Sequence, residues 1–583
     1  MRALAFAAFV ALASLITLSA RAQTGQGGYG PGTGTGASSS GPVGAPQIAA
    51  AGGAFGTQQN TIVVNGGAGG LSGTSGFGTT ANTRYFVSAN DTETAALTIT
   101  AANVTVECNP GVTIQQTTAS TALFTKGAGA ANFTVRNCGL GQPTSGTCAP
   151  VVNDTPTSPT NNLVLDNVEL NFNSSTCTDS AAGWVNISGG SGHRLNVWDP
   201  FSDEHVIVID NQTPTTHNNI SDVRIRNDFG PLIANADGKA IVATPANTTG
   251  SISYVDIDIN FQTAAYGIYS NGNGEIDHSR VVGRGKLTAN TSASGMFKLQ
   301  VTQSTVGPCV LDDGGKTGAN YSLLYVSDGY DVDVGDCHLH ATGATQNPIN
   351  VADMHGARFH DIVVGGDSTD RTGQLPTNGW STSKPCASFN VDGSSDTNAY
   401  NVIDGLTCFM PPSSTANGID VTCPNSSSVC DGNVIGSKNQ IIGNSTSGSC
   451  INITNSSGTS AANDLIVNPF CKGFTTGITI GSGVSGTQVN GAQIVGATTP
   501  VSDSGTNSRI VTHEVLATGT LSSGTLAVTF SGNDPFTSGT VYNCEGSDQT
   551  TVTNAVNFTY TSGTAMTITG TGTDVIRYRC RGY

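Results

Sequence analysis

Apolar and polar residues alternate in short runs along most of this chain. From Tyr85 onward, runs such as NVTVECNPGVTI and NISDVRIRND place Val or Ile at every second position and end at Asn, Gly, Asp or Ser. A period of two is typical of a strand with one buried face, and the terminating residues favour turns. Each unit therefore predicts two or three strands of about four to six residues.

The stretch 323–366 shows how these units repeat. Shifted along itself by 25 residues, it superimposes apolar on apolar and acidic on acidic positions, namely Val326 on Val351, Asp328 on Asp353, Val334 on Phe359 and Asp336 on Asp361. A repeat of this length cannot bury its own apolar face, so neighbouring copies must stack. We therefore predict an all-β solenoid of about a dozen coils over residues 83–505.

Both ends of the chain have a different character. Arg2, the apolar run 3–18 and Ala20-Arg21-Ala22 have the pattern of a secretory signal, residues 1–22, cleaved after Ala22. Residues 23–82 are rich in Gly and Ser and predict a linker or an N-terminal cap. We expect a secreted or cell-surface protein without a membrane span.

Residues 510–583 predict a small C-terminal antiparallel domain resembling a β-sandwich, with Gly-Thr and Ser-Gly turns. We interpret this domain as a cap on the open end of the solenoid. The alternative is a glycan-binding or trimerising module, so the protein is expected to be a monomer or a homotrimer.

Charge narrows the range of partners. The chain of 583 residues has only 11% charged residues and a net charge of −17. Its one basic cluster is Arg577, Arg579 and Arg581, which we expect on a solvated strand edge. Such a chain lacks the basic footprint of a nucleic-acid-binding protein, and it would repel a polyanion unless cations bridge the two.

The 14 cysteines predict disulfides, because an exported chain folds in an oxidising environment and no paired C-x-x-C favours zinc. Several of the sequence separations between neighbouring cysteines are close to the number of residues in one coil. Pairing of sequence neighbours is therefore the simplest hypothesis: Cys108 with Cys138, Cys148 with Cys177, Cys309 with Cys337, Cys386 with Cys408, Cys423 with Cys430, Cys450 with Cys471, and Cys544 with Cys580.

The Asn-rich corners and alternating strands in NVTVECNPGVTI, NISDVRIRND and NVIDGL resemble the right-handed parallel β-helix (pectin lyase-like) superfamily. Pectate lyases, polygalacturonases and phage tailspikes belong to it. The resemblance covers residues 83–503 and implies a right-handed parallel β-helix. It also implies an exported lyase or glycoside hydrolase that acts on an acidic or neutral polysaccharide, or alternatively a non-catalytic adhesin or tailspike-like protein that binds a cell-surface glycan.

No motif of one particular family is complete. The chain has no GHG or RIK block of the polygalacturonases, and Asp312-Asp313 lacks the family's flanking residues. Pectate lyases use calcium with a nearby Arg or Lys as base, so Ca²⁺ is the one cofactor that the resemblance implies. Asp256 with Asp258, and Asp331 with Asp333, would each lie on one strand face, where solvated positions are the competing interpretation.

The densest chemistry lies in residues 193–210. Glycoside hydrolysis needs two carboxyl groups at a set separation, one neutral and one ionised. The candidate catalytic residues are Asp199, Asp203, Glu204, His205 and Asp210, and the candidate substrate-binding residues are Arg194, Trp198 and Arg224. Charged turns that precede strands are a common structural alternative.

A second candidate site lies in the repeat that defines the coil. Stacking would align its acidic residues in two short ladders, with histidines nearby: Asp328, Asp336, Asp353, Asp361, His355 and His360. Stacked like charges repel each other unless a cation, a base or a shifted pKa compensates, although exposure at a corner would also suffice. No metal is assigned. Asn390, Asp420 and Asn452 are interpreted as a structural polar ladder.

Overall fold

The structure is a computed structural model. It describes residues 59–582 except for 128, several stretches within 144–294, and residues 315–321, 343–346, 366–379, 392–396, 425–427, 457–459, 512, 531–538 and 540–541. Every regular element in these described residues is a β-strand. None of the described residues forms a helix with the length and apolarity of a membrane span. The predicted signal peptide and most of the predicted linker lie outside the described residues.

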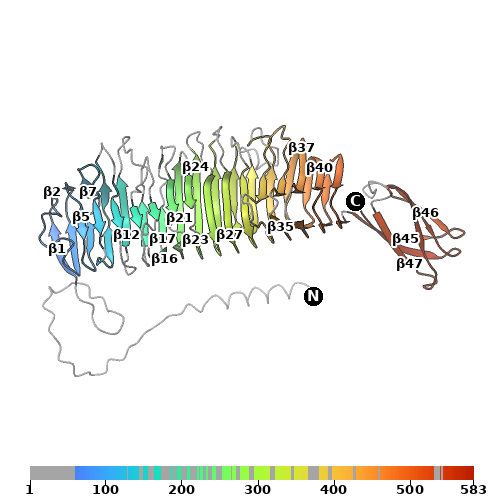
Figure 1. Cartoon of the computed structure of the whole chain (residues 1–583), viewed down its shortest axis with the longest axis horizontal. Coiled ribbons are helices and arrows are strands. Elements are labelled where there is room, and N and C mark those ends of the chain that lie inside the picture. The colour runs from blue at the N-terminus through green and yellow to red at the C-terminus, as the bar shows by residue number, and fades with distance from the viewer. Residues whose placement is uncertain are drawn as a thin grey trace, which may run out of the picture. The chain divides into compact units, whose positions relative to one another are not determined.

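Two long series of parallel strands, each strand hydrogen-bonded to the next, build the solenoid (Figure 1). The first series is β1 (Asn60–Val64), β3 (Thr83–Val87), β6 (Thr105–Cys108), β9 (Phe133–Arg136), β12 (Leu163–Asn171), β14 (Arg194–Trp198), β17 (Arg224–Asn227), β21 (Asp256–Thr263), β24 (Arg280–Leu287), β26 (Thr305–Asp312), β28 (Asp333–Gly335), β31 (Arg358–Gly365), β33 (Val402–Phe409), β36 (Val434–Ile435), β39 (Leu465–Val467), β41 (Gln488–Asn490) and β44 (Arg509–Val511). Its first strand lies within 23–82, the segment whose sequence predicts a linker or cap.

The second series is β5 (Leu97–Ile99), β8 (Phe124–Lys126), β11 (Val152–Asp154), β13 (Val185–Ile187), β15 (Ile207–Ile209), β19 (Lys239–Ala243), β22 (Tyr266–Ser270), β25 (Gly295–Thr302), β27 (Ser322–Tyr330), β30 (Ile349–His355), β32 (Ala387–Asn390), β34 (Ile419–Cys423), β37 (Gln440–Asn455), β40 (Phe470–Ile480) and β43 (Thr499–Asp503). Shorter strands complete the coils: β2 (Gly67–Ala68), β4 (Asp91–Glu93), β7 (Thr113–Gln116), β10 (Gly139–Gly141), β16 (Ile220–Ser221), β18 (Leu232–Ile233), β20 (Ile252–Ser253), β23 (Ile276–Asp277), β29 (Cys337–His340), β35 (Val429–Asp431), β38 (Ser460–Ala462) and β42 (Gln493–Val495). The fold is the predicted parallel β-helix.

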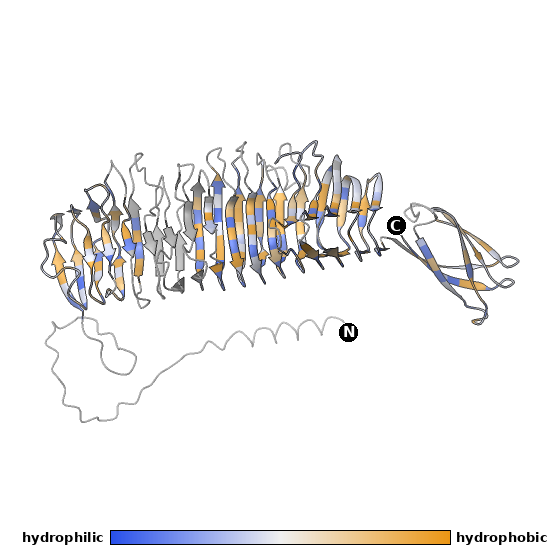
Figure 2. Cartoon of the chain, viewed as in Figure 1, coloured by the Kyte–Doolittle hydropathy of each residue, from blue (hydrophilic) through white to orange (hydrophobic). Residues whose placement is uncertain are grey.

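The predicted register of the repeat is confirmed. Val326 pairs with Val351 between β27 and β30, and Val334 pairs with Phe359 between β28 and β31. Inward side chains such as these form one continuous buried core, and hydrophobic and hydrophilic bands alternate across the strands (Figure 2). Burying each such Val, Leu, Ile or Phe contributes about 1.5–3 kcal/mol, which explains why the alternation in the sequence determines the fold.

Coils turn at residues in the left-handed backbone conformation, and we call this set the left-handed corner. Its described members are Asn82, Asn103, Asn132, Tyr254, His278, Gln303, Asp331, Gly356, Tyr400, Gly432, Asn463, Gly486 and Asn507. Gly and Asn reach positive φ more readily than other residues, which explains part of the Asn- and Gly-rich composition. At the N-terminal end the asparagines also bond to one another: Asn103 Nδ2 donates to Asn82 Oδ1 at 2.8 Å, and Asn132 Nδ2 donates to Asn103 Oδ1 at 2.8 Å.

Replacing Asn103 should distinguish backbone conformation from side-chain bonding. We expect Asn103→Ala to lower the free energy of unfolding by about 2 kcal/mol, because Ala lacks the ladder bonds and is strained at a φ of +57°. Asn103→Gly should cost less, because glycine relieves the strain. Urea denaturation of the three proteins would measure both effects, and equal losses for Ala and Gly would contradict this account of the corner.

Buried carboxylates organise the first coil. Asp91 accepts hydrogen bonds from the N–H groups of Gly70 (2.8 Å) and Leu71 (3.0 Å), and Glu93 accepts from Leu71 (2.9 Å) and Ser72 (3.1 Å). Both acidic side chains are fully buried. Burial, with the hydrogen bond and charge of Glu93 acting in the same direction, raises the pKa of Asp91 to about 6. These groups satisfy loop backbone donors and have a structural role.

A polar ladder also runs inside the C-terminal coils, one residue after the left-handed corner. Asn401 Nδ2 donates to Asn433 Oδ1 at 3.2 Å, and the backbone N–H of Asn433 donates to Asp464 Oδ1 at 2.9 Å. Asp464 is buried, and its Oδ2 has no hydrogen-bond partner. Burial outweighs the hydrogen bonds from Asn433 and raises the pKa of Asp464 to about 7, with the charge of Asp431 adding to the rise.

The predicted polar ladder of Asn390, Asp420 and Asn452 is partly wrong. Asp420 and Asn452 do pair between β34 and β37, and Asn452 Nδ2 donates to Asp420 Oδ1 at 2.7 Å. The partner of Asp420 on β32 is Ser388, whereas Asn390 pairs with Thr422. A shift of two residues keeps the side chain on the same face of the strand, so the sequence pattern alone could not exclude it.

Six of the seven predicted disulfides are confirmed. They are Cys108–Cys138, Cys309–Cys337, Cys386–Cys408, Cys423–Cys430, Cys450–Cys471 and Cys544–Cys580. Cys148 and Cys177 lie outside the described residues. Cys309 and Cys337 are direct partners in the register of β26 and β29, which is why a gap of about one coil predicts the bond.

The C-terminal region has its own core and two three-stranded antiparallel sheets. One has the order β45 (His513–Thr520), β50 (Val575–Gly582), β47 (Tyr542–Asp548), and the other has the order β46 (Thr525–Thr529), β49 (Ala565–Thr569), β48 (Asn557–Ser562). Arg577, Arg579 and Arg581 lie on β50, the central strand of its sheet, so the prediction that they occupy a strand edge is wrong.

Candidate functional site

The first predicted site is largely outside the described part of the chain. Its candidate catalytic residues, Asp199, Asp203, Glu204, His205 and Asp210, all fall there. The predicted substrate-binding residues lie on described strands. Arg194 on β14 is the register partner of Arg224 on β17, and Trp198 is the partner of Glu169 on β12. The site as a whole stays a prediction.

The second predicted site separates into two groups. Asp328, Asp353 and His355 line an open hollow of about 410 Å³, together with Gly329, Tyr330 and Thr397, and we call this the acidic hollow. Asp336, Asp361 and His360 do not line it. The sequence therefore identified three of the six residues of the acidic hollow and grouped them with three that lie elsewhere.

Backbone conformation explains why these positions carry Asp. Asp328 and Asp353 have φ values of +53° and +55°, and Asp336 and Asp361 have φ values of +54° and +51°. Asp, Asn and Gly are the residues that tolerate this region. The four aspartates of the two predicted acidic ladders therefore all occupy left-handed backbone positions, and this conformation alone favours Asp there.

Within the acidic hollow the two carboxyl groups belong to neighbouring coils. The pairings on either side, Ser327 with Ala352 and Gly329 with Met354, place Asp328 beside Asp353. Asp328 is exposed and accepts a hydrogen bond from Gln300 Nε2 at 2.7 Å. Asp353 is only 9% exposed. Neighbouring strands are about 4.8 Å apart, so Asp328 and Asp353 project from adjacent rungs of the solenoid into one hollow.

Aromatic and imidazole rings border the same hollow. Tyr330 is the register partner of His355. The ring of His355 meets that of Tyr400 edge-on, with their centroids 5.3 Å apart. Tyr330 is 46% exposed and Tyr400 is 59% exposed. The arrangement combines two carboxyl groups with exposed apolar rings in an open depression, which is the chemistry of a site for a sugar.

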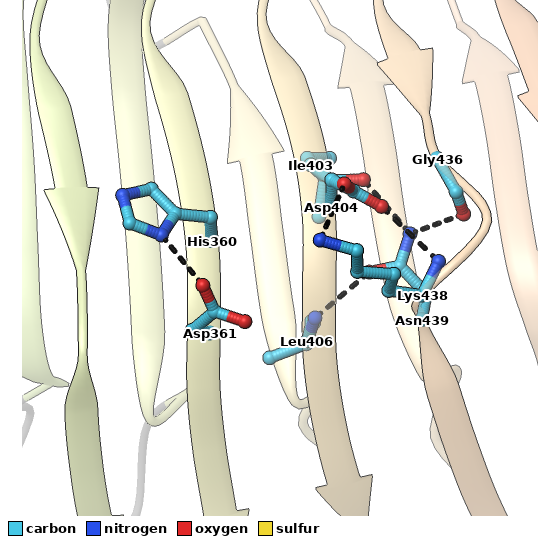
Figure 3. Close-up of polar contacts among 8 residues, drawn as sticks. All are labelled: His360, Asp361, Ile403, Asp404, Leu406, Gly436, Lys438 and Asn439. Atoms are coloured by element: carbon cyan, nitrogen blue, oxygen red, sulfur yellow. Dashed lines mark hydrogen bonds and ion pairs between the residues drawn. The ribbon is translucent and has the colours of Figure 1, made fainter. Parts of the chain in front are cut away.

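His360 forms a separate ion-pair cluster (Figure 3). Its Nδ1 lies 3.0 Å from an oxygen of Asp361, and its Nε2 lies 3.1 Å from an oxygen of Asp333. The hydrogen bond from His360 lowers the pKa of Asp361. On the next strand, Asp404 accepts from the N–H of Lys438 at 3.1 Å and lies 3.9 Å from its ammonium group. These charges already have partners, so we interpret the cluster as structural.

The sequence analysis missed three residues of the hollow, Gly329, Tyr330 and Thr397. It also missed Tyr254, His278 and Tyr400 along the left-handed corner. Tyr254 and His278 stack with ring centroids 5.3 Å apart. A signal for these three residues was present in the sequence. Aligning the coils at their corner residue places Tyr254, His278 and Tyr400 at one position. Asn or Gly would suit the left-handed backbone better there, so aromatic residues at this position are unexpected.

No metal centre is seen in the part of the chain that the structure describes: no group of three or more His, Cys, Asp or Glu side chains there is arranged to hold an ion. Asp256, one of the aspartates considered as a calcium ligand, lies 2.9 Å from Nη1 of Arg280. Asp333, another, pairs with His360.

No family model matches this chain, and no curated protein matches it. Among solved structures, the tailspike protein gp49 of Pseudomonas phage LKA1 is 10% identical, with 86% of this chain and 90% of that one covered and a TM-score of 0.28. The tailspike of Escherichia coli bacteriophage HK620, solved with a pentasaccharide, is 12% identical, with 86% of each chain covered and a TM-score of 0.31. The catalytic domain of a GH87 α-1,3-glucanase with nigerose is 10% identical, with 77% and 69% covered and a TM-score of 0.27.

The strand register itself defines the class of this protein. It is a parallel β-helix protein, with parallel pairing that continues from β1 to β44. A β-helix supports many functions, so the function has to be argued from the acidic hollow.

Proposed function

We propose that this protein is an exported, glycan-binding β-helix protein that hydrolyses its glycan at the acidic hollow. The observation that carries the proposal is the pairing of Asp328 and Asp353 on adjacent strands in one open hollow, beside Tyr330 and His355. Two carboxyl groups next to an exposed ring provide both the acid–base chemistry and a surface for a sugar.

The two carboxyl groups differ in exposure, which assigns their roles. We assign the nearly buried Asp353 as the general acid that protonates the leaving oxygen. Asp328 is exposed and accepts a hydrogen bond from Gln300. Asp328 is therefore the nucleophile or the group that stabilises positive charge at the anomeric carbon.

Hydrolysis is favoured over elimination by the lining of the hollow. A pectate-lyase-like reaction would need an Arg or Lys base near the substrate, and no Arg or Lys is among the described residues that line this depression. A second candidate function is binding without catalysis. It is favoured by the positive φ of both aspartates, because the backbone alone would select Asp, Asn or Gly there.

An activity screen tests the proposed function. The mature chain would be incubated with acidic and neutral plant and bacterial polysaccharides, with Ca²⁺ or with a chelator, and assayed for new reducing ends and for unsaturated products. We expect reducing ends from at least one polysaccharide and no unsaturated product. Binding without any cleavage would establish the non-catalytic alternative, and unsaturated products would show a lyase.

The spacing of the carboxyl groups predicts the stereochemistry. Retaining glycosidases hold their two carboxyl groups about 5–5.5 Å apart, and inverting enzymes hold them about 6.5–9.5 Å apart. Two carboxyl groups that project from adjacent strands, about 4.8 Å apart at the backbone, fit the shorter separation better than the longer one. We expect the first-formed sugar to keep the anomeric configuration of the substrate, as measured by proton NMR early in the reaction. Inversion would exclude Asp328 and Asp353 as the catalytic pair.

Export is also part of the proposal, supported by the disulfides and the signal-like residues 1–22. The protein recovered from the medium of a secreting host should begin at Gln23, as read by mass spectrometry of its N-terminal peptide. A secreted chain that still began at Met1 would contradict the predicted cleavage.

A further inference from the structure

An edge of exposed rings lies at the left-handed corner or one residue before it, in five of the six coils from Tyr254 to Tyr400. We call it the aromatic edge, and its members are Tyr254, His278, Tyr330, His355 and Tyr400. The three tyrosines are 58%, 46% and 59% exposed. Large aromatic side chains are expensive to leave in water, so three of them on one line indicate a surface that is covered by a ligand.

Backbone hydrogen bonds fix the order of the coils along this edge. The N–H of Tyr254 donates to Asp277, that of His278 to Thr302, that of Gln303 to Tyr330, and that of Asp331 to His355. His355 in turn forms a bridge with Ala399, the residue before Tyr400. From Tyr254 to Tyr400 the edge therefore crosses five strand spacings, or about 24 Å, with Gln303 at the one coil that carries no ring.

The structure leaves room for these rings to lie flat on the coils. A Cβ added to Gly432 would come within 2.8 Å of the Tyr400 ring, so the glycine at the next corner allows the ring to pack over the backbone. Tyr254 and His278 are stacked with an interplanar angle of 28°. Rings held in this way present a fixed apolar face at little cost in conformational entropy.

Charge distinguishes between the kinds of polymer that such an edge could bind. The acidic residues that follow the edge are Asp277, Asp328, Asp331 and Asp353. Arg280, two residues beyond the corner, already pairs with Asp256 at 2.9 Å, and the whole chain has a net charge of −17. A polymer rich in carboxylate or sulfate groups would be repelled along this line.

We infer that the aromatic edge binds an uncharged polysaccharide whose chain lies along the solenoid axis, crosses the acidic hollow and stacks sugar rings on Tyr254, Tyr330 and Tyr400. The inference rests on the proposed function, because the same hollow provides the cleavage site. The apolar C–H face of a pyranose ring packs on an aromatic face, and carboxylates and imidazoles accept or donate hydrogen bonds to its hydroxyl groups. The inference identifies the substrate as a neutral glycan several sugar rings long.

Affinity electrophoresis of the full mature chain tests this inference. Gels would contain dextran, galactomannan or xyloglucan as uncharged probes, or polygalacturonate as a charged probe. The variants are Tyr254→Ala with Tyr400→Ala, and the conservative pair Tyr254→Phe with Tyr400→Phe. Leu516→Ala, which alters a 57% exposed apolar side chain of the C-terminal domain, is the matched control.

We expect at least one uncharged polysaccharide to retard the protein and polygalacturonate to leave its mobility unchanged. The double Ala variant should weaken retardation about tenfold or more, whereas the double Phe variant and Leu516→Ala should bind as the parent does. Affinity for oligosaccharides of the bound polymer should rise with length until the edge is covered.

Failure of this inference can be told apart from failure of the proposed function. Normal binding and cleavage by the double Ala variant would refute the binding role of the aromatic edge, and the proposed hydrolysis at the acidic hollow would still stand. Retardation by polygalacturonate alone would overturn the neutral substrate class. Binding that depends on the tyrosines, with no cleavage of any glycan, would support the edge and overturn the hydrolase.

Discussion

Replacing the buried Asp464 with Asn should stabilise the protein by up to about 4 kcal/mol at about pH 8. Burial raises the pKa of Asp464 to about 7 from an ordinary value of 3.8. An amide keeps the acceptor for the hydrogen bonds from Asn433 and carries no charge. It would extend a ladder that is already built of Asn401 and Asn433.

The direction of the pH effect follows from proton binding. Between about pH 4 and about pH 7 the native state holds a proton on Asp464 that the unfolded chain has released. The stabilising contribution is therefore fully present below about pH 4 and is lost as the pH rises through about 7. For the parent protein, the free energy of unfolding should fall by about 3 kcal/mol between about pH 5 and about pH 9 on account of this group.

Urea denaturation at a series of pH values would measure this effect. Asp464→Asn should flatten the dependence and leave a smaller slope of the same sign from Asp91 and Asp420, because burial raises the pKa of both. Asp336→Asn is the control, because it makes the same substitution at an exposed aspartate. If Asp464→Asn were less stable than the parent at about pH 8, the fold would depend on the charged carboxylate of Asp464 and not on a neutral ladder.

Asp353→Asn should lower the rate of glycan hydrolysis by about 100-fold or more, because it removes the proton that the leaving oxygen requires. Asn adopts positive φ as readily as Asp, so the backbone at +55° is not strained and the fold is expected to persist. The rate would be measured from reducing ends released at saturating polysaccharide, and binding from affinity electrophoresis.

The matched control for that experiment is again Asp336→Asn, a left-handed Asp that does not line the hollow. It should retain full activity. Full activity in Asp353→Asn would show that Asp353 serves only to accommodate the left-handed backbone and is not catalytic. Loss of binding together with activity would indicate a role in holding the glycan and would remove Asp353 as the acid.

The fold could be predicted because it depends on a local sequence pattern, the alternation of apolar and polar residues. Stacked Val, Ile and Phe at period two determine which face is buried, so the pairings of Val326 with Val351 and Val334 with Phe359 follow from one alignment of the repeat. The position of a ladder along the strand is less constrained. Moving by two residues preserves the buried face, and for this reason the partner of Asp420 proved to be Ser388 and not Asn390.

The site could be predicted only in part, because charge and backbone conformation select the same residues. Asp328 and Asp353 were found from their repetition, and His355 from its place nearby in the sequence. The same reasoning also selected Asp336, Asp361 and His360, and these two aspartates meet the same backbone requirement outside the hollow. Which of two stacked ladders faces a depression depends on how each strand bends. Tyr330 was hidden for a different reason, since an aromatic residue in an alternating pattern looks like part of the core.

Left-handed corners also make the length of this molecule adjustable. Each coil bonds to its two neighbours, and the segment from Asp331 to His355 begins at one corner and ends just before the next, at Gly356. Duplicating such a segment would add a rung with matching corner, core and edge positions. Gene duplication in steps of one coil could thus lengthen a binding surface by about 4.8 Å at a time without a new fold, and the spacing of sugar rings along a polymer could then be matched by counting rungs.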